Sequence, residues 1–327
     1  MVPRDPVFIV GGARSGTTFL AKLLDSHPDV LYRHEPDSVL VNTEIPFLPR
    51  REELETFLAP ARRYLDALRH VRATKVSGQR PIFDKTYRSS LQKKRFLAGL
   101  YLAKTAEKAG RPFLRKPLVI PDCVDRGFSE RIWYLIKSVN SPWRTLLFSE
   151  AMPNYRFIHI LRHPCAVISS KLKGFESGLM GSPVTYLRSL FDAGMAEGYP
   201  FTFEDLEAKS YEERAAFQWM VCNQRIHDDM EGREGYRMVI YKELCQELES
   251  TTRQLFDFVG LSWDAQTQRF VQHLESSEAH DASYFEVVRP PLAALDKWRD
   301  QLSSEQIARI ERIVCHAELG RRFLNAT

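Results

Sequence analysis

The sequence predicts an α/β fold in which a P-loop-like central parallel β-sheet carries helices on both faces. Short runs of β-branched and aromatic residues indicate buried strands, and the stretches between them space apolar residues as helices do. Alternation of the two favours a mostly parallel sheet. The predicted strands are residues 7–10, 30–32, 112–114, 133–136, 156–161 and 236–240. The longer predicted helices are residues 53–70, 90–108 and 304–319.

Length and composition indicate one globular domain. The 327 residues are 44% hydrophobic and 27% charged, which excludes disordered and low-complexity classes of protein. The net charge of only +4 gives no reason to expect nucleic acid as a partner. No shift of composition marks a linker, so residues 1–327 are interpreted as a single domain, with residues 37–110 and 174–200 as insertions that face the substrate. The sequence gives no oligomeric state.

Targeting and metal signals are absent from the sequence. No window approaches about 18 uncharged apolar residues, and the first residues do not resemble a signal peptide. We therefore expect no membrane span and a cytoplasmic location, unless an upstream anchor precedes residue 1. The five cysteines are scattered singly, which predicts neither disulfides nor a zinc site, and we expect no metal requirement.

The strongest motif is a glycine-containing turn between the first strand and a helix. Residues 11–16 follow the Gly-x-x-x-x-Gly frame of a phosphate-binding loop. Glycines let the backbone approach an anion, and the amides of a helix start bind phosphate. The anion site is predicted to use Arg14 and the residues that follow it, Ser15, Gly16, Thr17 and Thr18.

The same loop lacks the lysine of nucleotide triphosphatases. Thr17 occupies the position after the second glycine, where that lysine reaches the β- and γ-phosphates. The cation is Arg14 instead, inside the loop. A P-loop kinase or nucleotidase therefore remains only as an alternative, to be recognised by Mg²⁺-dependent ATP turnover.

A second strand–turn–helix segment completes a family resemblance. Residues 157–170 read FIHILRHPCAVISS, with Arg162 at the strand end and Ser170 eight residues later. Together with GARSGTTFL at residues 12–20, this segment resembles the PAPS-dependent sulfotransferases, most of all the tyrosylprotein and carbohydrate branches. PAPS is 3′-phosphoadenosine 5′-phosphosulfate, and PAP is the product after sulfuryl transfer. His163 stands where aspartate is frequent in that family.

The resemblance implies specific roles for residues in both halves of the chain. It implies that the loop binds the 5′-phosphosulfate and that Arg162 and Ser170 bind the 3′-phosphate. Weaker matches imply that Tyr241 lies beside the nucleotide and that Ser283 and Lys297 belong to a segment that closes over it. Residues 37–110 and 174–200 remain unmatched.

Glu35 is the candidate general base. The strand at residues 30–32 is predicted to run parallel to residues 7–10, so Glu35 and Arg14 are expected at the same rim of the sheet, facing one another. The resemblance implies the same role for Glu35, whose pKa we expect burial to raise. His34 is the rival base, and a simple ion pair between Glu35 and Arg33 is the alternative without catalysis. Lys137 is the candidate that stabilises the sulfonate or the leaving oxygen.

The function implied is transfer of a sulfuryl group from PAPS to an acceptor hydroxyl of a carbohydrate, lipid, small molecule or tyrosine. A protein that binds PAP without catalysis is a further alternative. The acceptor cannot be identified from the sequence. Residues 174–200 are either a surface excursion or a lid, and the basic residues Arg80, Lys85 and Arg88 either face an acidic acceptor or are solvated.

Overall fold

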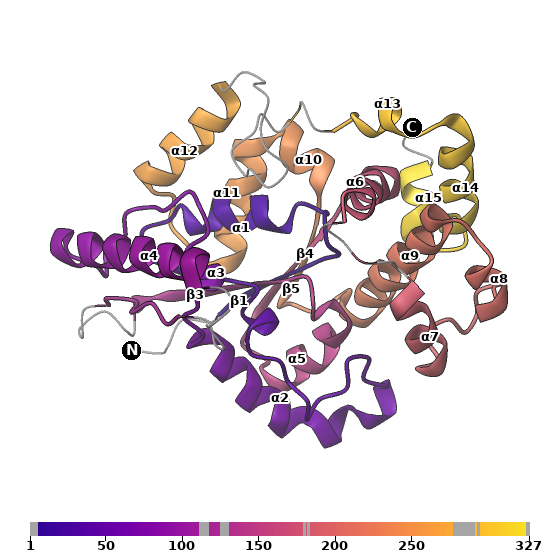
Figure 1. Cartoon of the computed structure of the whole chain (residues 1–327), viewed down its shortest axis with the longest axis horizontal. Helices are drawn as coiled ribbons and strands as arrows, with labels where there is room; N and C mark the ends of the chain where they lie inside the picture. The colour runs from indigo at the N-terminus through magenta and orange to yellow at the C-terminus, as the bar shows by residue number, and fades with distance from the viewer. Residues whose placement is uncertain are drawn as a thin grey trace.

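A parallel β-sheet forms the centre of the molecule (Figure 1). The computed structural model describes residues 6–110, 118–124, 131–178, 181, 184–276, 292 and 295–324. Within these residues one five-stranded sheet has the order β2-β3-β1-β4-β5, and every neighbouring pair is parallel. The strands are β1 (Val7–Val10), β2 (Val30–His34), β3 (Trp133–Ser138), β4 (Arg156–Leu161) and β5 (Tyr236–Ile240). The predicted α/β class and parallel sheet are confirmed.

Helices cover both faces of the sheet, as the sequence predicts. The helices are α1 (Thr17–Asp25), α2 (Leu54–Arg69), α3 (Thr74–Ser77), α4 (Ser90–Gly110), α5 (Thr145–Ala151), α6 (Pro164–Glu176), α7 (Val184–Asp192), α8 (Phe203–Glu207), α9 (Tyr211–Met230), α10 (Tyr241–Gln246), α11 (Leu248–Val259), α12 (Ala265–Ser276), α13 (Trp298–Gln301), α14 (Ser304–Val314) and α15 (Glu318–Leu324). Short 3₁₀ turns are η1 (Pro36–Ser38), η2 (Arg51–Glu53) and η4 (Pro142–Arg144).

Strand β1 shows how the two faces form. Its side chains alternate between faces because successive residues of a strand point in opposite directions. Val7 and Ile9 join the apolar cluster beneath α1, α11 and α12. Phe8 and Val10 join the cluster on the opposite face, against α2, α5 and α9. In Figure 1 these two groups of helices lie on opposite sides of the sheet.

Most predicted elements agree with the structure, and the differences lie in where the elements end. Strands β1, β4 and β5 have the predicted bounds, and β2 and β3 each run two residues further. The predicted strand at 112–114 lies outside the described residues. The helix predicted over 304–319 is wrong beyond Val314, where α14 ends in a turn closed by Ala317 N–H donating to the Val314 carbonyl. Gly320 of α15 packs on that carbonyl, leaving no room for a side chain.

All five strands end at the same rim, and the predicted site residues follow those ends. The phosphate loop follows β1, Glu35 follows β2, and Arg162 follows β4. Lys137 is the penultimate residue of β3, and Tyr241 begins α10 directly after β5. Ligands of open parallel sheets bind at the carboxyl ends of the strands. The fold therefore gathers residues that are up to 227 positions apart in the chain, from Arg14 to Tyr241.

Candidate active site

The phosphate loop turns between Val10 and the start of α1 at Thr17. Gly16 has a φ of 97°, in the left-handed region that favours glycine. A Cβ atom there would lie 2.4 Å from the ring of Tyr241. Gly16 is thus required both by the turn and by close packing of Tyr241. The amides of the first turn of α1 are left for a ligand at this helix start.

The two predicted phosphate motifs meet at Arg14. Its Nε donates to Ser170 Oγ at 2.8 Å, and Arg162 Nη1 donates to the Arg14 carbonyl at 3.1 Å. The Arg162 guanidinium also lies over the Tyr241 ring, 4.6 Å from its centroid. Four predicted nucleotide ligands from β1, β4, α6 and α10 therefore form one contiguous cluster. This arrangement can hold two anionic groups of one ligand.

The segment around Lys297 packs beside the second motif. Trp298 stacks on His163 with ring centroids 4.5 Å apart and planes 15° apart, and Gln301 accepts from Ser169 Oγ at 2.7 Å. Lys297 is therefore held close to the start of α6. Ser283, its predicted companion, lies outside the described residues.

His163 caps the start of α6. Its Nδ1 accepts a hydrogen bond from Cys165 N–H at 3.2 Å, as an N-cap does. Burial, with a smaller contribution from Arg299, lowers the pKa of His163 to about 4. The imidazole is therefore neutral near pH 7 and free to accept this bond.

Glu35 and Lys137 form an ion pair where β2 and β3 end. The register pairs His34 with Lys137, and Glu35 N–H donates to the Lys137 carbonyl at 2.8 Å. The Lys137 ammonium lies 2.5 Å from Glu35 Oε1 and is buried. Glu35 has a φ of 47°, a strained conformation for a residue with a side chain. Strain of this kind is concentrated at functional sites.

A second lysine, which the sequence analysis missed, also contacts Glu35. Lys75 of α3 places its ammonium 3.2 Å from Glu35 Oε2, and 54% of its side chain is exposed. It also donates to Ser38 Oγ, which donates in turn to the Glu35 carbonyl. No sequence pattern singles out Lys75, because α3 reaches the rim only through tertiary packing on β2.

These lysines reverse the expected direction of the pKa shift of Glu35. Burial by itself raises the pKa of the carboxyl, but Lys137, His34 and Lys75 together outweigh burial and lower it to about 2, with Lys137 as the main contributor. Glu35 is therefore ionised at neutral pH and is a weak base until a cation moves away from it. The predicted alternative, an ion pair with Arg33, is wrong: Arg33 is buried and makes a bidentate pair with Asp122 at 2.8 and 2.7 Å.

His34, the rival base, is buried behind Glu35. Its Nδ1 shares a 2.7 Å hydrogen bond with the Tyr32 hydroxyl, and its Nε2 lies 3.7 Å from Glu35 Oε1. Burial, followed by repulsion from Lys137, lowers the pKa of His34 to about 3. A neutral imidazole at this depth supports the orientation of Glu35, whereas Glu35 is closer to the surface.

Asp37 fastens the turn that carries Glu35, a role the sequence did not reveal. Its buried carboxylate accepts from the hydroxyls of Ser138 and Ser141 and from the amide of Asn140, all after or at the end of β3. These bonds connect the turn after β2 to the turn after β3. The signal available in the sequence was the run Glu-Pro-Asp after one strand and Ser-x-Asn-Ser after the next.

The two unmatched segments meet at the surface. Phe47 and Tyr186 stack with centroids 5.6 Å apart and planes 27° apart, and both rings are partly exposed. Arg50 donates to the Asp192 carbonyl at 2.8 Å. Residues 174–200, predicted as loop and short helix, contain the end of α6 and helix α7. Their contact with residues 37–110 is consistent with one shared surface, though it does not identify an acceptor.

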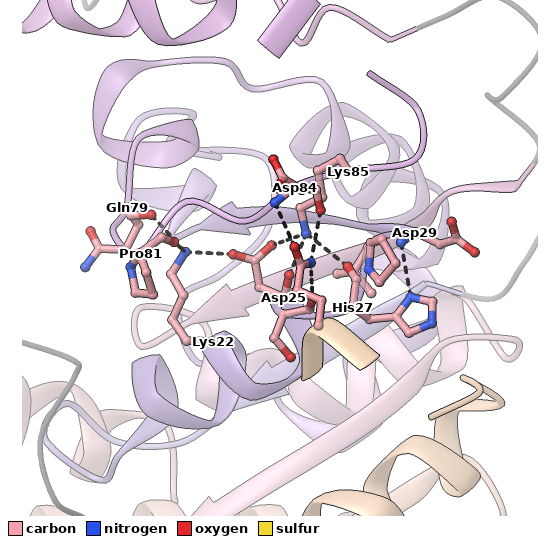
Figure 2. Close-up of polar contacts among 12 residues, drawn as sticks. Lys22, Asp25, His27, Asp29, Gln79, Pro81, Asp84 and Lys85 are labelled. Atoms are coloured by element: carbon pink, nitrogen blue, oxygen red, sulfur yellow. Dashed lines mark hydrogen bonds and ion pairs between the residues drawn. The ribbon is translucent and has the colours of Figure 1, made fainter. Parts of the chain in front are cut away.

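A buried charge network joins the end of α1 to residues 79–85 (Figure 2). Lys22 of α1 contacts Asp25 at 2.7 Å and the carbonyls of Gln79 and Pro81. Lys85 contacts the other oxygen of Asp25 at 2.9 Å and is also buried. Lys85 therefore neither faces an acceptor nor is solvated, contrary to both alternatives. The network holds residues 79–85 against α1.

Replacing Asp25 by asparagine is expected to lower the free energy of unfolding by about 3 kcal/mol, because it leaves two buried ammonium groups without their anion. Burial raises the pKa of Asp25, but Lys22 and Lys85 lower it overall. Its contribution to stability is thus present above the unfolded-state pKa and is lost as pH falls through the lower folded-state value. Urea unfolding measures both effects. Asp84→Asn, at the exposed pair with Lys93, is the control, and equal losses for the two variants would contradict the assignment.

Two general observations limit the kind of site. Among the described residues, no group of three or more His, Cys, Asp or Glu side chains is placed to hold a metal ion. No helix in the same part of the chain is long and apolar enough to cross a membrane.

A parallel sheet, a glycine loop at a helix start and an arginine–serine cluster beside it are typical of α/β enzymes that bind phosphate groups. The chain belongs to the sulfotransferase family, whose family profile matches residues 6–265. It is 22% identical to mouse (Mus musculus) carbohydrate sulfotransferase 5 over 98% of this chain and 84% of the relative. Identity to rat (Rattus norvegicus) carbohydrate sulfotransferase 1 is 22%, over 97% of this chain and 79% of the relative. Both alignments cross the phosphate motifs and the unmatched insertions.

Solved structures give more distant matches. The sulfotransferase domain of the Synechococcus PCC 7002 olefin synthase is 17% identical, with a TM-score of 0.46, over 95% of this chain and 94% of that one. A mouse sulfotransferase solved in complex with PAP is 11% identical, with a TM-score of 0.44, over 99% of this chain and 89% of that one.

Proposed function

We propose that this enzyme transfers the sulfuryl group of PAPS to an acceptor hydroxyl and releases PAP. The observation that carries the proposal is the cluster in which Arg14 of the loop contacts Ser170 and Arg162. One nucleotide with phosphates at both ends of its ribose matches such a double anion site. A triphosphate does not require the second half of the cluster, and the loop lacks the lysine that a P-loop kinase uses.

The proposed reaction is an in-line displacement at the sulfur atom, at the rim of the sheet. The acceptor hydroxyl gives its proton to Glu35 while its oxygen forms a bond to sulfur. The bond from sulfur to the 5′-phosphate oxygen breaks, and its electron pair stays on that oxygen. Arg14 and the amides at the start of α1 stabilise this leaving oxygen, and Lys137 stabilises the sulfonate oxygens.

Base activation and sulfonate binding are coupled in this proposal. Lys137 holds the pKa of Glu35 low while the two are paired. When the Lys137 ammonium turns to the sulfonate, Glu35 loses its strongest counter-charge and becomes a better base. The carboxylate is thus basic only when the donor is in place, which limits unproductive proton uptake.

The acceptor class that we propose first is a saccharide. The relatives that align over nearly the whole chain are carbohydrate sulfotransferases, and the exposed Phe47–Tyr186 pair supplies aromatic surface of the kind that packs on sugar rings. The transfer assay uses labelled PAPS with a saccharide panel. Tight PAP binding without transfer to any hydroxyl would favour a binding protein, and Mg²⁺-dependent ATP turnover would favour a kinase.

Calorimetry with PAP and with adenosine 5′-phosphate tests the nucleotide assignment. We expect PAP to bind about 10- to 150-fold more tightly, the range for hydrogen bonds to a charged group. Ser170→Ala is expected to remove about tenfold of this preference, with a smaller loss of affinity for adenosine 5′-phosphate because Ser170 also accepts a hydrogen bond from Arg14. Ser177→Ala, later in the same helical segment, is the matched control. Equal affinity of the wild-type protein for the two nucleotides would rule out PAPS as the donor.

A further inference from the structure

Glu35 presents its two oxygens to different surroundings. Oε1 lies 2.5 Å from the buried Lys137 and 3.7 Å from His34 Nε2, on the protein side. Oε2 lies 3.2 Å from Lys75, whose side chain is 54% exposed, compared with 3% for Lys137. An acceptor arriving from solvent therefore meets Oε2 and the Lys75 ammonium together. Lys137 is therefore the cation on the side of the sulfuryl donor, and Lys75 is the cation on the side of the acceptor.

Lys75 is held in this place by packing, so its position is defined. Helix α3 is fastened to β2 by Arg33, which donates to Ser77 Oγ at 3.3 Å and to the Arg69 carbonyl at 2.8 Å. Thr74 donates to the carboxylate of Glu107 in α4. Because Arg33 lies two residues before Glu35 in the same chain segment, Arg33 positions both the candidate base and α3.

Proton transfer to Glu35 leaves Lys75 without a counter-charge. Before the reaction, the Glu35 carboxylate lies between two ammonium groups. Once the carboxyl is protonated, Lys137 has the sulfonate as a partner, but Lys75 has lost its anion. Because 54% of the Lys75 side chain is exposed, water solvates its ammonium and the loss of Glu35 as a partner costs little. A carboxylate or sulfate on the acceptor, next to the reacting hydroxyl, gives Lys75 a new counter-charge, which a neutral acceptor does not supply.

We propose that Lys75 is a specificity-determining residue that selects acceptors carrying an anionic group, carboxylate or sulfate, beside the hydroxyl that receives the sulfuryl group. This inference rests on the proposed function. Arg80, five residues after Lys75, is exposed as well. The anionic group pairs with Lys75, and the neighbouring hydroxyl is thereby brought to Glu35 Oε2.

The test compares two sugars that differ in one group. Methyl β-glucuronide carries a carboxylate where methyl β-glucoside carries a neutral hydroxymethyl group. Binding of each to the PAP-saturated protein is measured by saturation-transfer NMR titration, which needs no turnover. We expect the wild-type protein to bind the glucuronide about two- to fivefold more tightly, as for one partly exposed ion pair.

Variants assign the preference to Lys75. In Lys75→Met the ratio of affinities is expected to fall to about one, and Lys75→Arg is expected to keep most of it because the charge remains. Lys94→Met, which removes an exposed lysine of α4, is the matched control and keeps the full ratio. Unchanged PAP affinity in all three variants shows that they are folded.

Two results would overturn the proposal while leaving the proposed function intact. The first is equal binding of the two sugars, or binding of neither, by wild-type protein that still discriminates PAP from adenosine 5′-phosphate. The second is a preference for glucuronide that survives in Lys75→Met. If PAP itself does not bind, the proposed function and this inference are both wrong.

Discussion

Glu35→Gln is expected to lower the turnover number of sulfuryl transfer by about 10²- to 10⁴-fold, the range of a positioned general base. The amide keeps the shape of the side chain and can still accept from Lys137, so the affinity for PAP is expected to stay within about twofold. Single-turnover transfer from labelled PAPS measures the rate, and calorimetry with PAP measures binding.

The matched control is Glu52→Gln, which makes the same change at an exposed glutamate of η2. It is expected to retain wild-type turnover. A second variant, His34→Gln, separates the two candidate bases, because the neutral imidazole contributes orientation through Tyr32 and is expected to cost much less than Glu35. Full turnover in Glu35→Gln together with loss of turnover in His34→Gln would identify His34 as the general base.

Lys137→Met is expected to lower the turnover number by about 10²- to 10³-fold, since it removes a cation aimed at charge that develops in the transition state. It is also expected to shift the acid limb of the pH–rate profile upward. The Lys137 ammonium is the main group that lowers the pKa of Glu35, whose other charged or titratable neighbours are Lys75 and His34. Without Lys137, burial raises the pKa of Glu35, so activity is lost at a higher pH as pH falls.

The pH profile separates a catalytic lysine from a structural one. A lysine that only fills space would change stability and leave the acid limb where it is in the wild-type protein. Lys137→Arg keeps the charge and is expected to keep the acid limb near the wild-type position, even where its bulk lowers the rate. If the acid limb does not move in Lys137→Met, Lys137 does not control the pKa of Glu35.

The two residues that leave regular geometry at the rim are both candidates for the chemistry. Arg14 has a φ of 73° and Glu35 a φ of 47°, and each lies just after a strand of the parallel sheet. Such conformations persist only where the surroundings fix them. The Ser170 and Arg162 contacts fix Arg14, and the bonds of Asp37 and Ser38 fix the turn of Glu35.

Local sequence determined the elements and the anion motifs. Residues 7–10 are apolar and β-branched or aromatic, and a glycine turn and a helix follow them, so the phosphate loop is encoded within fourteen consecutive positions, 7–20. The same holds for residues 157–170. Hydrophobic periodicity, glycine and proline determine local structure through neighbouring residues. A short stretch of sequence is therefore enough to predict that structure.

Tertiary structure alone decided which charges meet. Lys75, 40 positions from Glu35, becomes its partner because Arg33 of β2 donates to Ser77 of α3, and Lys85 becomes buried because residues 79–85 pack on α1. The lowered pKa of Glu35 follows mainly from Lys137 at the end of the neighbouring strand, with a smaller contribution from Lys75, since burial alone would have raised it. Coulomb attraction depends on distance in space and on local dielectric, and sequence separation fixes neither. The local sequence thus specified where the predicted phosphate loop lies, whereas tertiary packing specified the charge around the candidate base.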